Sequence, residues 1–273
     1  MKKLGLISGI GELPIAIAVD ARSKGYHVIA VGLEPLADKA LESCVDEMRW
    51  INVGKLGDII EYLKKSGVEE VVMAGKVPKS LLYKSKITPD LRAIKLLFTL
   101  KDRSDDSILL AIAKELKKDG MKLLNTTDFS SLLLTPEGVL TTKGPSEEEW
   151  KDIAFGWDIA KEMGRLDIGQ TVVIKNQAVM AIEAIEGTDE AIKRGGKLAG
   201  GGAVVVKVSK PQQDMRFDVP VVGLDTLRSM IEVKCRVLAI EAEKSILLQR
   251  EKLVRDANET GIAVVGFRDK SSL

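Results

Sequence analysis

Short apolar runs alternate along the first seventy-five residues with stretches in which apolar residues recur about every 3.6 positions. The apolar runs span residues 3–8, 26–32, 49–53 and 69–75. The intervening stretches 14–24 and 55–66 each end directly before a glycine, as helices do. Because strands and helices in alternation form parallel sheets with right-handed crossovers, this pattern predicts an α/β protein.

A change of pattern between residues 134 and 148 divides the chain. Two helices and a short strand are predicted before it, at 90–101, 105–119 and 121–126. The stretch itself reads LTPEGVLTTKGPSEE, whose prolines and glycines are typical of a linker. Because 273 residues exceed the usual size of one domain, we expect two domains, over residues 1–133 and 149–273.

The second half again alternates helices with strands. After a helix at 146–163, the stretch VVIKNQAVMAIEA is typical of a hairpin that turns at Asn176. A short helix over TDEAIKRGG and a strand over AVVVKVS follow. The remaining predicted elements are helices at 224–232 and 250–260 and strands at 236–242, 245–248 and 262–267. We therefore expect a mixed α/β fold for this domain.

Charge and hydropathy argue against two kinds of partner. The 41 basic and 40 acidic residues leave a net charge of +1, which argues against binding nucleic acid by overall charge. No stretch approaches the roughly 18 uninterrupted apolar residues of a membrane-spanning helix. Glycines and Glu12 interrupt the basic and then apolar N-terminus, so we expect a first strand there rather than a signal peptide. We expect the protein in the cytoplasm.

Histidine and cysteine are scarce, which narrows the chemistry. Cys44 and Cys235 lie far apart and predict neither a disulfide framework nor a zinc site. The single histidine, His27, begins an apolar strand, where a strand-end or core role is usual. Catalytic triads and metal sites built on histidine are therefore not expected. The groups that remain available for catalysis and ligand binding are carboxylates, lysines, arginines, hydroxyls and backbone amides.

The stretch SGIGELP connects the first predicted strand to the first helix. A dinucleotide fingerprint needs three glycines, but only Gly9 and Gly11 are present, and Pro14 occupies the third position. NAD is therefore not favoured, although Glu34 after the second strand resembles the acid that would bind a ribose. The Gly9–Gly11 turn is expected to leave backbone N–H groups free at a helix start, where phosphate binds well. A merely tight turn is the alternative.

Two further stretches of the first half carry candidate residues. Gly75 and Lys76 follow the fourth strand, and ligands of open α/β sheets bind at the carboxyl ends of strands. Lys76 would then share a crevice with the first loop, unless it is an ordinary surface lysine. Asp105 and Asp106 follow Ser104 at a helix start, where acids commonly stabilise the helix dipole without any further role.

The turn EGTDE, after the predicted hairpin, is rich in acids. Thr188 could cap the next helix with Asp189 in its first turn. Alternatively, Glu183, Glu186 and Asp189 could supply the oxygen ligands that Mg²⁺ prefers. The sequence leaves both interpretations open.

The stretch KPQQDMRFDVP combines the most candidate residues. Pro211 and Pro220 favour extended backbone before them, and alternate residues of an extended chain share a side. We therefore expect Asp214, Arg216 and Asp218 to project together. Arginine suits phosphate contacts, while a carboxylate can hold Mg²⁺ or deprotonate a water. An ion-paired edge strand is the alternative.

Six of these stretches together resemble one family. SGIGELP, AGKVPK, DDSILLAIA, GRLDIGQ, EGTD and KPQQDMRFDVPVVG occur here in the order found in LpxI-type UDP-2,3-diacylglucosamine pyrophosphatases. The resemblance runs from residue 3 to about residue 267. It departs from the family pattern at Ser8, at Ile10 and in the glycine-rich stretch KRGGKLAGGG, where the roles of residues 194–202 stay open.

The resemblance implies a fold and a reaction. It implies a Rossmann-like N-terminal domain and an α/β C-terminal domain. It also implies hydrolysis, with Mg²⁺ or another divalent metal, of UDP-2,3-diacylglucosamine to UMP and 2,3-diacylglucosamine 1-phosphate in lipid A biosynthesis. The family's catalytic aspartate corresponds to Asp218, with Asp214 and Asp218 as candidate metal ligands. The implied substrate-binding residues are Gly9, Gly11, Glu12, Gly75, Lys76, Asp106, Gln170, Thr188, Asp189, Lys210 and Arg216.

We expect the substrate between the domains, with Gly11 and Lys76 on one wall and Thr188, Asp189 and Arg216 on the other. An acylated substrate implies transient contact with the inner membrane leaflet, and the sequence leaves peripheral association and a homodimer open. Two alternatives compete with hydrolysis. One is a nicotinamide-dependent oxidoreductase, and the other is a non-catalytic protein that binds UDP-sugars or acyl-phosphosugars.

Overall fold

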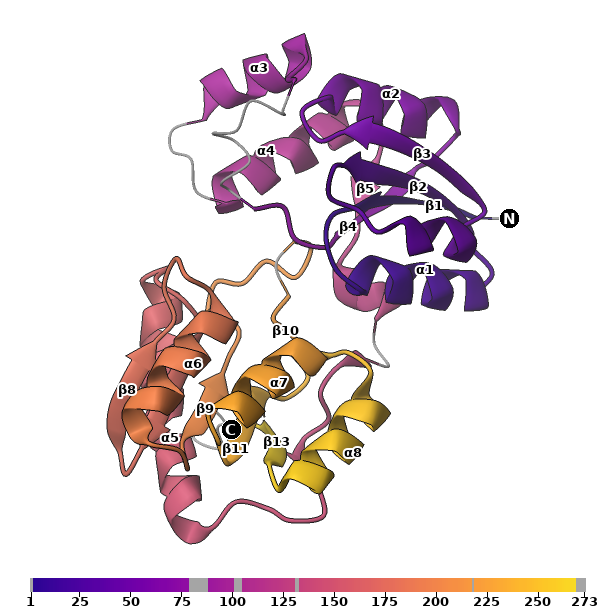
Figure 1. Cartoon of the computed structure of the whole chain (residues 1–273). Helices are drawn as coiled ribbons and strands as arrows, with labels where there is room; N and C mark the ends of the chain where they lie inside the picture. The colour runs from indigo at the N-terminus through magenta and orange to yellow at the C-terminus, as the bar shows by residue number, and fades with distance from the viewer. Residues whose placement is uncertain (1, 79–87, 101–104, 131–132, 218, 269–273) are drawn as a thin grey trace. The chain divides into compact units, whose positions relative to one another are not determined.

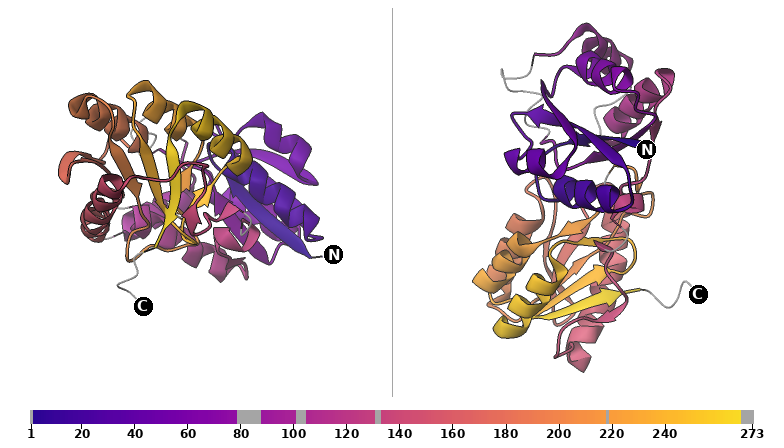
Figure 2. Two further views of the ribbon diagram at one scale, coloured as in Figure 1. Left: turned by 90° about the horizontal axis from the view of Figure 1, so that it is seen from below. Right: turned by 90° about the vertical axis from the view of Figure 1, so that its right-hand side faces the viewer.

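The protein, represented by a computed structural model, divides into two compact units (Figure 1). Unit 1 comprises Met1–Ser131 with Met215–Phe217, and unit 2 comprises Leu132–Asp214 with Asp218–Leu273. The structure describes residues 2–78, 88–100, 105–130, 133–217 and 219–268. Figure 2 shows that each unit is built on its own sheet, with helices packed against it.

Unit 1 contains a parallel sheet with the strand order β3-β2-β1-β4-β5. Its strands are β1 (Lys3–Ser8), β2 (His27–Glu34), β3 (Glu47–Asn52), β4 (Glu70–Ala74) and β5 (Lys122–Leu123). Its helices are α1 (Leu13–Ser23), η1 (Lys39–Cys44), α2 (Leu56–Lys65), α3 (Leu91–Thr99), α4 (Asp105–Lys118) and η3 (Thr126–Phe129). The predicted Rossmann-like fold is therefore confirmed.

Apolar residues on both faces of this sheet explain its helical layers. β2 is buried along Val28–Leu33, as expected for a parallel strand covered on both sides. Helix α1 covers one face, and α2 and α4 cover the other (Figure 1). The core on the second face joins Ile60 and Leu63 of α2 to Leu96 of α3 and Leu116 of α4. The alternating pattern of the sequence thus produces two buried layers around one sheet.

Unit 2 contains a mixed sheet with the order β6-β13-β11-β9-β7-β8. The strands of this sheet are β6 (Gly138–Val139), β7 (Thr171–Lys175), β8 (Ala178–Ile182), β9 (Val204–Lys207), β11 (Val237–Glu241) and β13 (Ala263–Phe267). A separate parallel pair is formed by β10 (Val221–Val222) and β12 (Ile246–Leu247). The helices of unit 2 are α5 (Glu147–Arg165), α6 (Thr188–Ala199), α7 (Leu224–Glu232) and α8 (Arg250–Thr260). Strands β9, β11 and β13 are parallel, whereas β6, β7 and β8 pair antiparallel. The predicted mixed α/β fold is confirmed.

The predicted hairpin of unit 2 turns where the sequence indicated. Asn176 and Gln177 both have positive φ, at 52° and 55°, and separate the paired residues Lys175 and Ala178. This is the geometry of a two-residue turn that matches the twist of the strands. The buried carboxylate of Asp152 in α5 accepts hydrogen bonds from both turn amides, at 3.0 and 2.6 Å. The turn is therefore anchored to the helix that packs beneath it.

Residues 134–148, which we expected to form a linker, lie within unit 2. Gly138 and Val139 form β6, which pairs antiparallel with β13 at the edge of the sheet. The amide of Thr135 donates to the carbonyl of Ser245 at 2.9 Å. Because β6 has only two residues, it leaves no alternating pattern in the sequence. The prolines and glycines of this stretch therefore favoured the prediction of a linker.

Candidate active site

Two loops meet at the carboxyl ends of β1 and β4. From β1 the chain proceeds outward through β2 and β3, whereas β4 and β5 lie on the opposite side of β1. This reversal is the position at which open α/β sheets usually bind their ligands. Ile10 and Lys76 exchange two backbone hydrogen bonds of 2.9 Å each, and the Gly9 amide donates to Ala74 at 2.8 Å. We call residues 9–12 and 75–76 the loop pair.

The loop pair corrects one expectation. The Gly9–Gly11 turn was expected to leave its backbone N–H groups free for a phosphate. Instead, the amides of Gly9 and Ile10 donate to carbonyl groups of unit 1, because the turn pairs with the neighbouring loop. Gly11 is exposed, has φ +111° and has no atom within 4 Å of the position a Cβ would occupy. Any anion bound here must therefore contact the later part of the turn.

Gly9 and Gly75 are glycines because the two loops approach closely. A Cβ on Gly9 would lie 2.7 Å from the carbonyl oxygen of Lys76. A Cβ on Gly75, whose φ is +88°, would lie 2.7 Å from the carbonyl carbon of Gly9. Atoms this close would overlap, so each glycine is required by the backbone of the other loop. Packing alone explains both residues.

The other unit 1 candidates lie at helix starts or on the surface. Glu12 occupies the N-cap of α1, which has no side-chain capping hydrogen bond, and its side chain is exposed. Lys76 is also exposed. Asp106 lies in the first turn of α4, as predicted, but its side chain falls outside the described part of the structure.

In unit 2, a buried lysine brings together two of the predicted residues. Lys207, which is 5% exposed at the end of β9, donates from Nζ to the Thr188 hydroxyl at 2.9 Å. That hydroxyl, in the first turn of α6, donates to Glu183 Oε1 at 2.9 Å. The other oxygen of Glu183 accepts a hydrogen bond of 3.4 Å from the backbone amide of Gln170. We call Gln170, Glu183, Thr188 and Lys207 the Lys207 cluster.

Sequence reasoning did not select Lys207. It is the polar residue at the end of an apolar strand, next to the chemistry-bearing stretch KPQQD, and that position was the available signal. Two buried oxygens at the cluster, Oε1 of its member Gln170 and Oγ1 of the neighbouring Thr171, have no hydrogen-bond partner in the described residues. Buried polar atoms of this kind normally bind a water or a ligand. They mark this end of the sheet as a site that a ligand could complete.

The acids near α6 have separate partners. Glu183 bonds to Thr188, Glu186 pairs with Arg194, and Asp189 accepts a bond of 3.2 Å from Thr226. The alternative in which Glu183, Glu186 and Asp189 together hold Mg²⁺ is therefore not supported, because each carboxylate is directed to its own protein donor.

The predicted extended stretch after Lys210 is instead a series of turns. Residues 211–212 and 215–217 are turns. The backbone amide of Gln213 donates to the Lys210 carbonyl at 3.0 Å. The side-chain oxygen of Gln213, Oε1, accepts from the backbone amide of Lys210 at 2.8 Å. These two bonds close the chain on itself after Pro211. The expectation that alternate residues project to one side is therefore wrong for the described residues. The Lys210 ammonium pairs with Asp167 of the same unit.

Arg216 belongs to unit 1, and this corrects its predicted place on the wall of the second domain. Backbone oxygens of Met215 and Arg216 accept bonds from Thr126, at 3.1 and 3.4 Å. The Phe217 ring packs against the unit 1 core and lies 4.9 Å from the Arg216 guanidinium. Asp214 belongs to unit 2, and Asp218 lies outside the described residues.

An ion pair between a buried glutamate and a partly buried lysine supports the base of this stretch. Glu241, 3% exposed at the end of β11, accepts hydrogen bonds from the amide and the hydroxyl of Ser209, at 2.7 and 2.8 Å. It also pairs with Lys161 of α5, which donates to the Ser209 carbonyl at 2.9 Å and lies 5.0 Å from the Trp157 ring centroid. Sequence reasoning missed this pair, because an acid that ends an apolar strand resembles an ordinary surface residue.

Burial and pairing shift the pKa values of both partners. Burial alone would raise the pKa of Glu241, but Lys161 and the bonds from Ser209 hold it below its ordinary value. Burial lowers the pKa of Lys161, against the opposing effect of Glu241. The Glu241 carboxylate is therefore ionised at neutral pH, and it fixes Ser209 directly before the stretch that carries Asp214 and Asp218.

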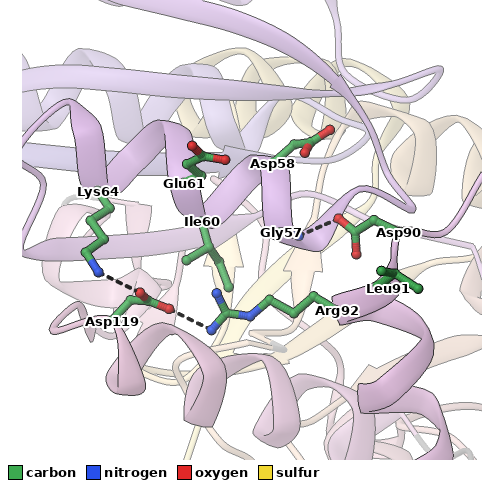
Figure 3. Close-up of a pocket in the computed structure, with 9 residues that line it drawn as sticks. All are labelled: Gly57, Asp58, Ile60, Glu61, Lys64, Asp90, Leu91, Arg92 and Asp119. Carbon is green, nitrogen blue, oxygen red and sulfur yellow. Dashed lines mark hydrogen bonds and ion pairs between the residues drawn. The ribbon is translucent and has the colours of Figure 1, made fainter.

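An open pocket of about 500 Å³ lies elsewhere in unit 1, between α2, the start of α3 and the end of α4 (Figure 3). None of the predicted site residues lines it. Asp119 pairs there with Lys64 at 2.9 Å and with Arg92 at 2.6 Å, and Asp90 accepts from the Gly57 amide. Because these charges satisfy one another, we interpret this pocket as a structural contact between helices.

The described residues do not form a metal centre. No group of three or more histidine, cysteine, aspartate or glutamate side chains among them could hold a metal ion. Of the two candidate ligands, only Asp214 lies in the described part of the chain. In the same part, no helix is long and apolar enough to cross a membrane.

The fold and the loop pair define a class of protein. Unit 1 is a Rossmann-like α/β domain with a glycine turn at the point where its strand order reverses, and unit 2 is a mixed α/β domain. Two family models cover both halves: the LpxI N-terminal domain matches residues 3–133, and the LpxI C-terminal domain matches residues 136–265. The chain belongs to the LpxI family.

One curated relative matches along its whole length. The UDP-2,3-diacylglucosamine pyrophosphatase LpxI of Caulobacter vibrioides is 30% identical over 97% of this chain and 98% of its own. Solved structures are far more distant. A phosphoribosylglycinamide synthetase from Anaerococcus prevotii is 13% identical with a TM-score of 0.26, over 70% of this chain and 34% of its own. An N5-carboxyaminoimidazole synthetase from Staphylococcus aureus is 15% identical with a TM-score of 0.24, over 64% and 38%. Scores this low support no inference.

Proposed function

We propose that this protein hydrolyses the pyrophosphate of UDP-2,3-diacylglucosamine, releasing UMP and 2,3-diacylglucosamine 1-phosphate for lipid A biosynthesis. The observation that carries the proposal is the match to the Caulobacter pyrophosphatase over 97% of the chain, together with both LpxI domain models. The loop pair and the Lys207 cluster support it, since both occupy strand ends at which an anionic ligand is expected.

Asp218 is the residue to which we assign the chemistry, on the resemblance of Gln213–Pro220 to the family's stretch. A water attacks one phosphorus, the anhydride P–O bond breaks, and Asp218 accepts the proton of the attacking water. In a chain with a single histidine, a carboxylate is the natural base. Lys161 and Glu241 hold the Ser209 end of the stretch in place.

The remaining substrate contacts are proposed in two groups. Gly11, Glu12 and Lys76 of the loop pair and Asp106 of α4 are assigned to unit 1, as is Arg216. Gln170, Thr188, Asp189 and Lys210 are assigned to unit 2. Gly9 and Gly75 are proposed to shape the loop pair rather than to contact substrate, because packing already requires both.

We also propose that the reaction needs a divalent metal ion, with Asp214 and Asp218 as its ligands. The described carboxylates do not form such a centre, so the resemblance alone supports this part of the proposal. Removing divalent ions with EDTA should abolish turnover, and adding Mg²⁺ should restore it. Full turnover in EDTA would remove the metal from the proposal and leave the hydrolase intact.

The experiment that tests the proposed function is turnover of UDP-2,3-diacylglucosamine labelled in its uridine. The purified full-length protein should release labelled UMP in the presence of Mg²⁺. Binding of the substrate without release of UMP would favour the non-catalytic binding protein. Binding of NAD, tested by titration calorimetry, would favour the oxidoreductase that the incomplete glycine fingerprint argues against.

Two properties of the protein in the cell extend this proposal. We place it in the cytoplasm, in transient contact with the inner membrane leaflet, because a diacylated substrate resides in a bilayer. A homodimer is tested by sedimentation velocity, in which a single species at twice the chain mass of 29.7 kDa would establish it.

A further inference from the structure

Helix α3 presents large apolar side chains to solvent. Leu91 is 76% exposed and Phe98 is 86% exposed, on a helix of nine residues. Lys95 lies between them and is also exposed. Because residues four and three positions apart share one side of a helix, Leu91, Lys95 and Phe98 form one outer face. We call these three residues the α3 face.

The inner side of α3 is already used by the fold. Leu96 is buried in the unit 1 core, and Ala93, Leu97 and Leu100 pack against it. Figures 1 and 2 show α3 at the extremity of unit 1, beyond α2 and α4 and away from the sheet. Leu91 borders the open pocket of Figure 3, but most of its surface and that of Phe98 faces solvent, so the α3 face contributes little to holding the helix on the domain. Exposed apolar residues of this size on one face usually mark an interaction site.

The surrounding sequence is strongly basic. Residues 74–103 contain eight of the chain's 41 basic residues and only two of its 40 acidic residues, a net charge of +6. The rest of the chain therefore carries 33 basic and 38 acidic residues, a net charge of −5. On α3 itself, Arg92 is bound to Glu115 and Asp119 of unit 1, whereas Lys95 forms no ion pair with another described residue.

This combination fits one kind of partner. Apolar side chains beside lysines and arginines are the features that hold helices at the surface of an anionic bilayer. A second copy of the chain fits less well, because a symmetric contact through the α3 face would bring two exposed Lys95 ammonium groups together among apolar side chains. We propose that the α3 face docks unit 1 onto a membrane that contains anionic phospholipid, with Phe98 and Leu91 inserted among the headgroups. The proposal rests on the proposed function only for its purpose, which is access to an acylated substrate.

The test measures binding to vesicles, which does not require turnover. The full-length protein is sedimented with vesicles of phosphatidylcholine alone or with about one third phosphatidylglycerol. We expect binding to the anionic vesicles only, and weaker binding as salt rises. The double variant Leu91→Ser/Phe98→Ser should bind at least about tenfold more weakly, since partial burial of both side chains contributes on the order of 1.4 kcal/mol or more. Lys95→Glu should also weaken binding.

The matched control changes two exposed apolar residues of unit 2. Ile185 and Leu198 are 101% and 67% exposed, so Ile185→Ser/Leu198→Ser removes comparable apolar surface elsewhere. This control should bind like the wild type. Equal loss in both double variants, or no binding of the wild type to anionic vesicles, overturns the proposal. So does dissociation of a dimer by the Leu91→Ser/Phe98→Ser change without vesicle binding, which would make the face a contact between copies.

Hydrolysis is measured separately, on a soluble short-chain analogue of the proposed substrate. The Leu91→Ser/Phe98→Ser variant should hydrolyse it at the wild-type rate, because the α3 face takes no part in the chemistry. A loss of this activity with an unchanged melting temperature would place α3 in the site and contradict the proposal. Vesicle binding by a protein that lacks pyrophosphatase activity would refute the proposed function and leave the docking surface standing.

Discussion

At the scale of single residues, Glu241 carries the sharpest stability prediction. Glu241→Gln keeps a hydrogen-bond acceptor for Ser209 but removes the negative charge beside Lys161. Lys161 is partly buried, so leaving its charge without a partner is costly, and the unfolding free energy should fall by about 1–3 kcal/mol in denaturant titrations. Lys161→Met in the same background should recover part of this loss. Full additivity of the two changes would show that the pair is not coupled.

We also expect the contribution of Glu241 to stability to depend on pH. The pKa of Glu241 is lowered in the folded protein relative to its ordinary value of 4.5. Its ionised form therefore adds stability above the unfolded-state pKa, and this stability is lost as the pH falls through the lowered folded-state pKa. The stability difference between wild type and Glu241→Gln should be full at pH 7 and shrink below about pH 4.5. A difference that grows toward acid pH would contradict the assigned direction.

Two glycines of the loop pair, Gly75 and Gly11, should differ in how much stability they lose on substitution by alanine. Gly75→Ala should lower unfolding free energy by more than about 2 kcal/mol, because its φ is +88° and its Cβ would overlap the Gly9 backbone. Gly11→Ala meets only the cost of a positive φ, about 1–2 kcal/mol, since nothing lies within 4 Å. Thermal and denaturant unfolding of both variants measure this. Equal losses would mean that the close approach of the loops is not what requires Gly75.

At the scale of elements, the start of α5 shows a cap that the sequence encodes. The Ser146 hydroxyl accepts from the Glu149 amide at 3.3 Å, and the Glu149 carboxylate accepts from the Ser146 amide at 2.8 Å. Ser146→Ala should lower unfolding free energy by about 1 kcal/mol. Ser43→Ala, which removes an exposed hydroxyl bonded to a carbonyl in η1, should change it by less than about 0.5 kcal/mol. Similar losses would argue that the cap adds no stability.

Elements with strong periodicity were predictable from the sequence. The ranges predicted for α7 and α8, 224–232 and 250–260, coincide with those of the structure. The two-residue strands β6 and β10 gave no signal, because proline and glycine lie within or beside them, whereas the equally short β5 and β12 lie in apolar runs that the sequence indicated. The turns after Lys210 were missed for a related reason. The Gln213 side chain closes them, and proline alone suggested extended backbone.

At the scale of the whole molecule, the sequence predicted a Rossmann-like first domain and a mixed second one, and both are present. It did not predict that Met215–Phe217 would belong to unit 1. That assignment depends on Phe217 packing in a core more than ninety residues earlier in the chain, which no local pattern reveals. The sequence identified the candidate residues because they lie in recognisable short stretches. Their partners, such as Lys207 and Glu241, were identified only by contacts distant in sequence.

Hydrolysis by this protein is best tested by comparing the wild type with Asp218→Ala in the release of UMP from UDP-2,3-diacylglucosamine. The wild type should release UMP with Mg²⁺ present, whereas Asp218→Ala should lose all measurable turnover, beyond the 10²- to 10⁴-fold expected for loss of a general base alone. The variant should still fold, as judged by its melting temperature, and should still bind substrate through Arg216 and the loop pair. Retention of more than about a tenth of the wild-type rate would remove Asp218 from the chemistry. A wild type that releases no UMP at all would contradict the assignment of this protein as a pyrophosphatase.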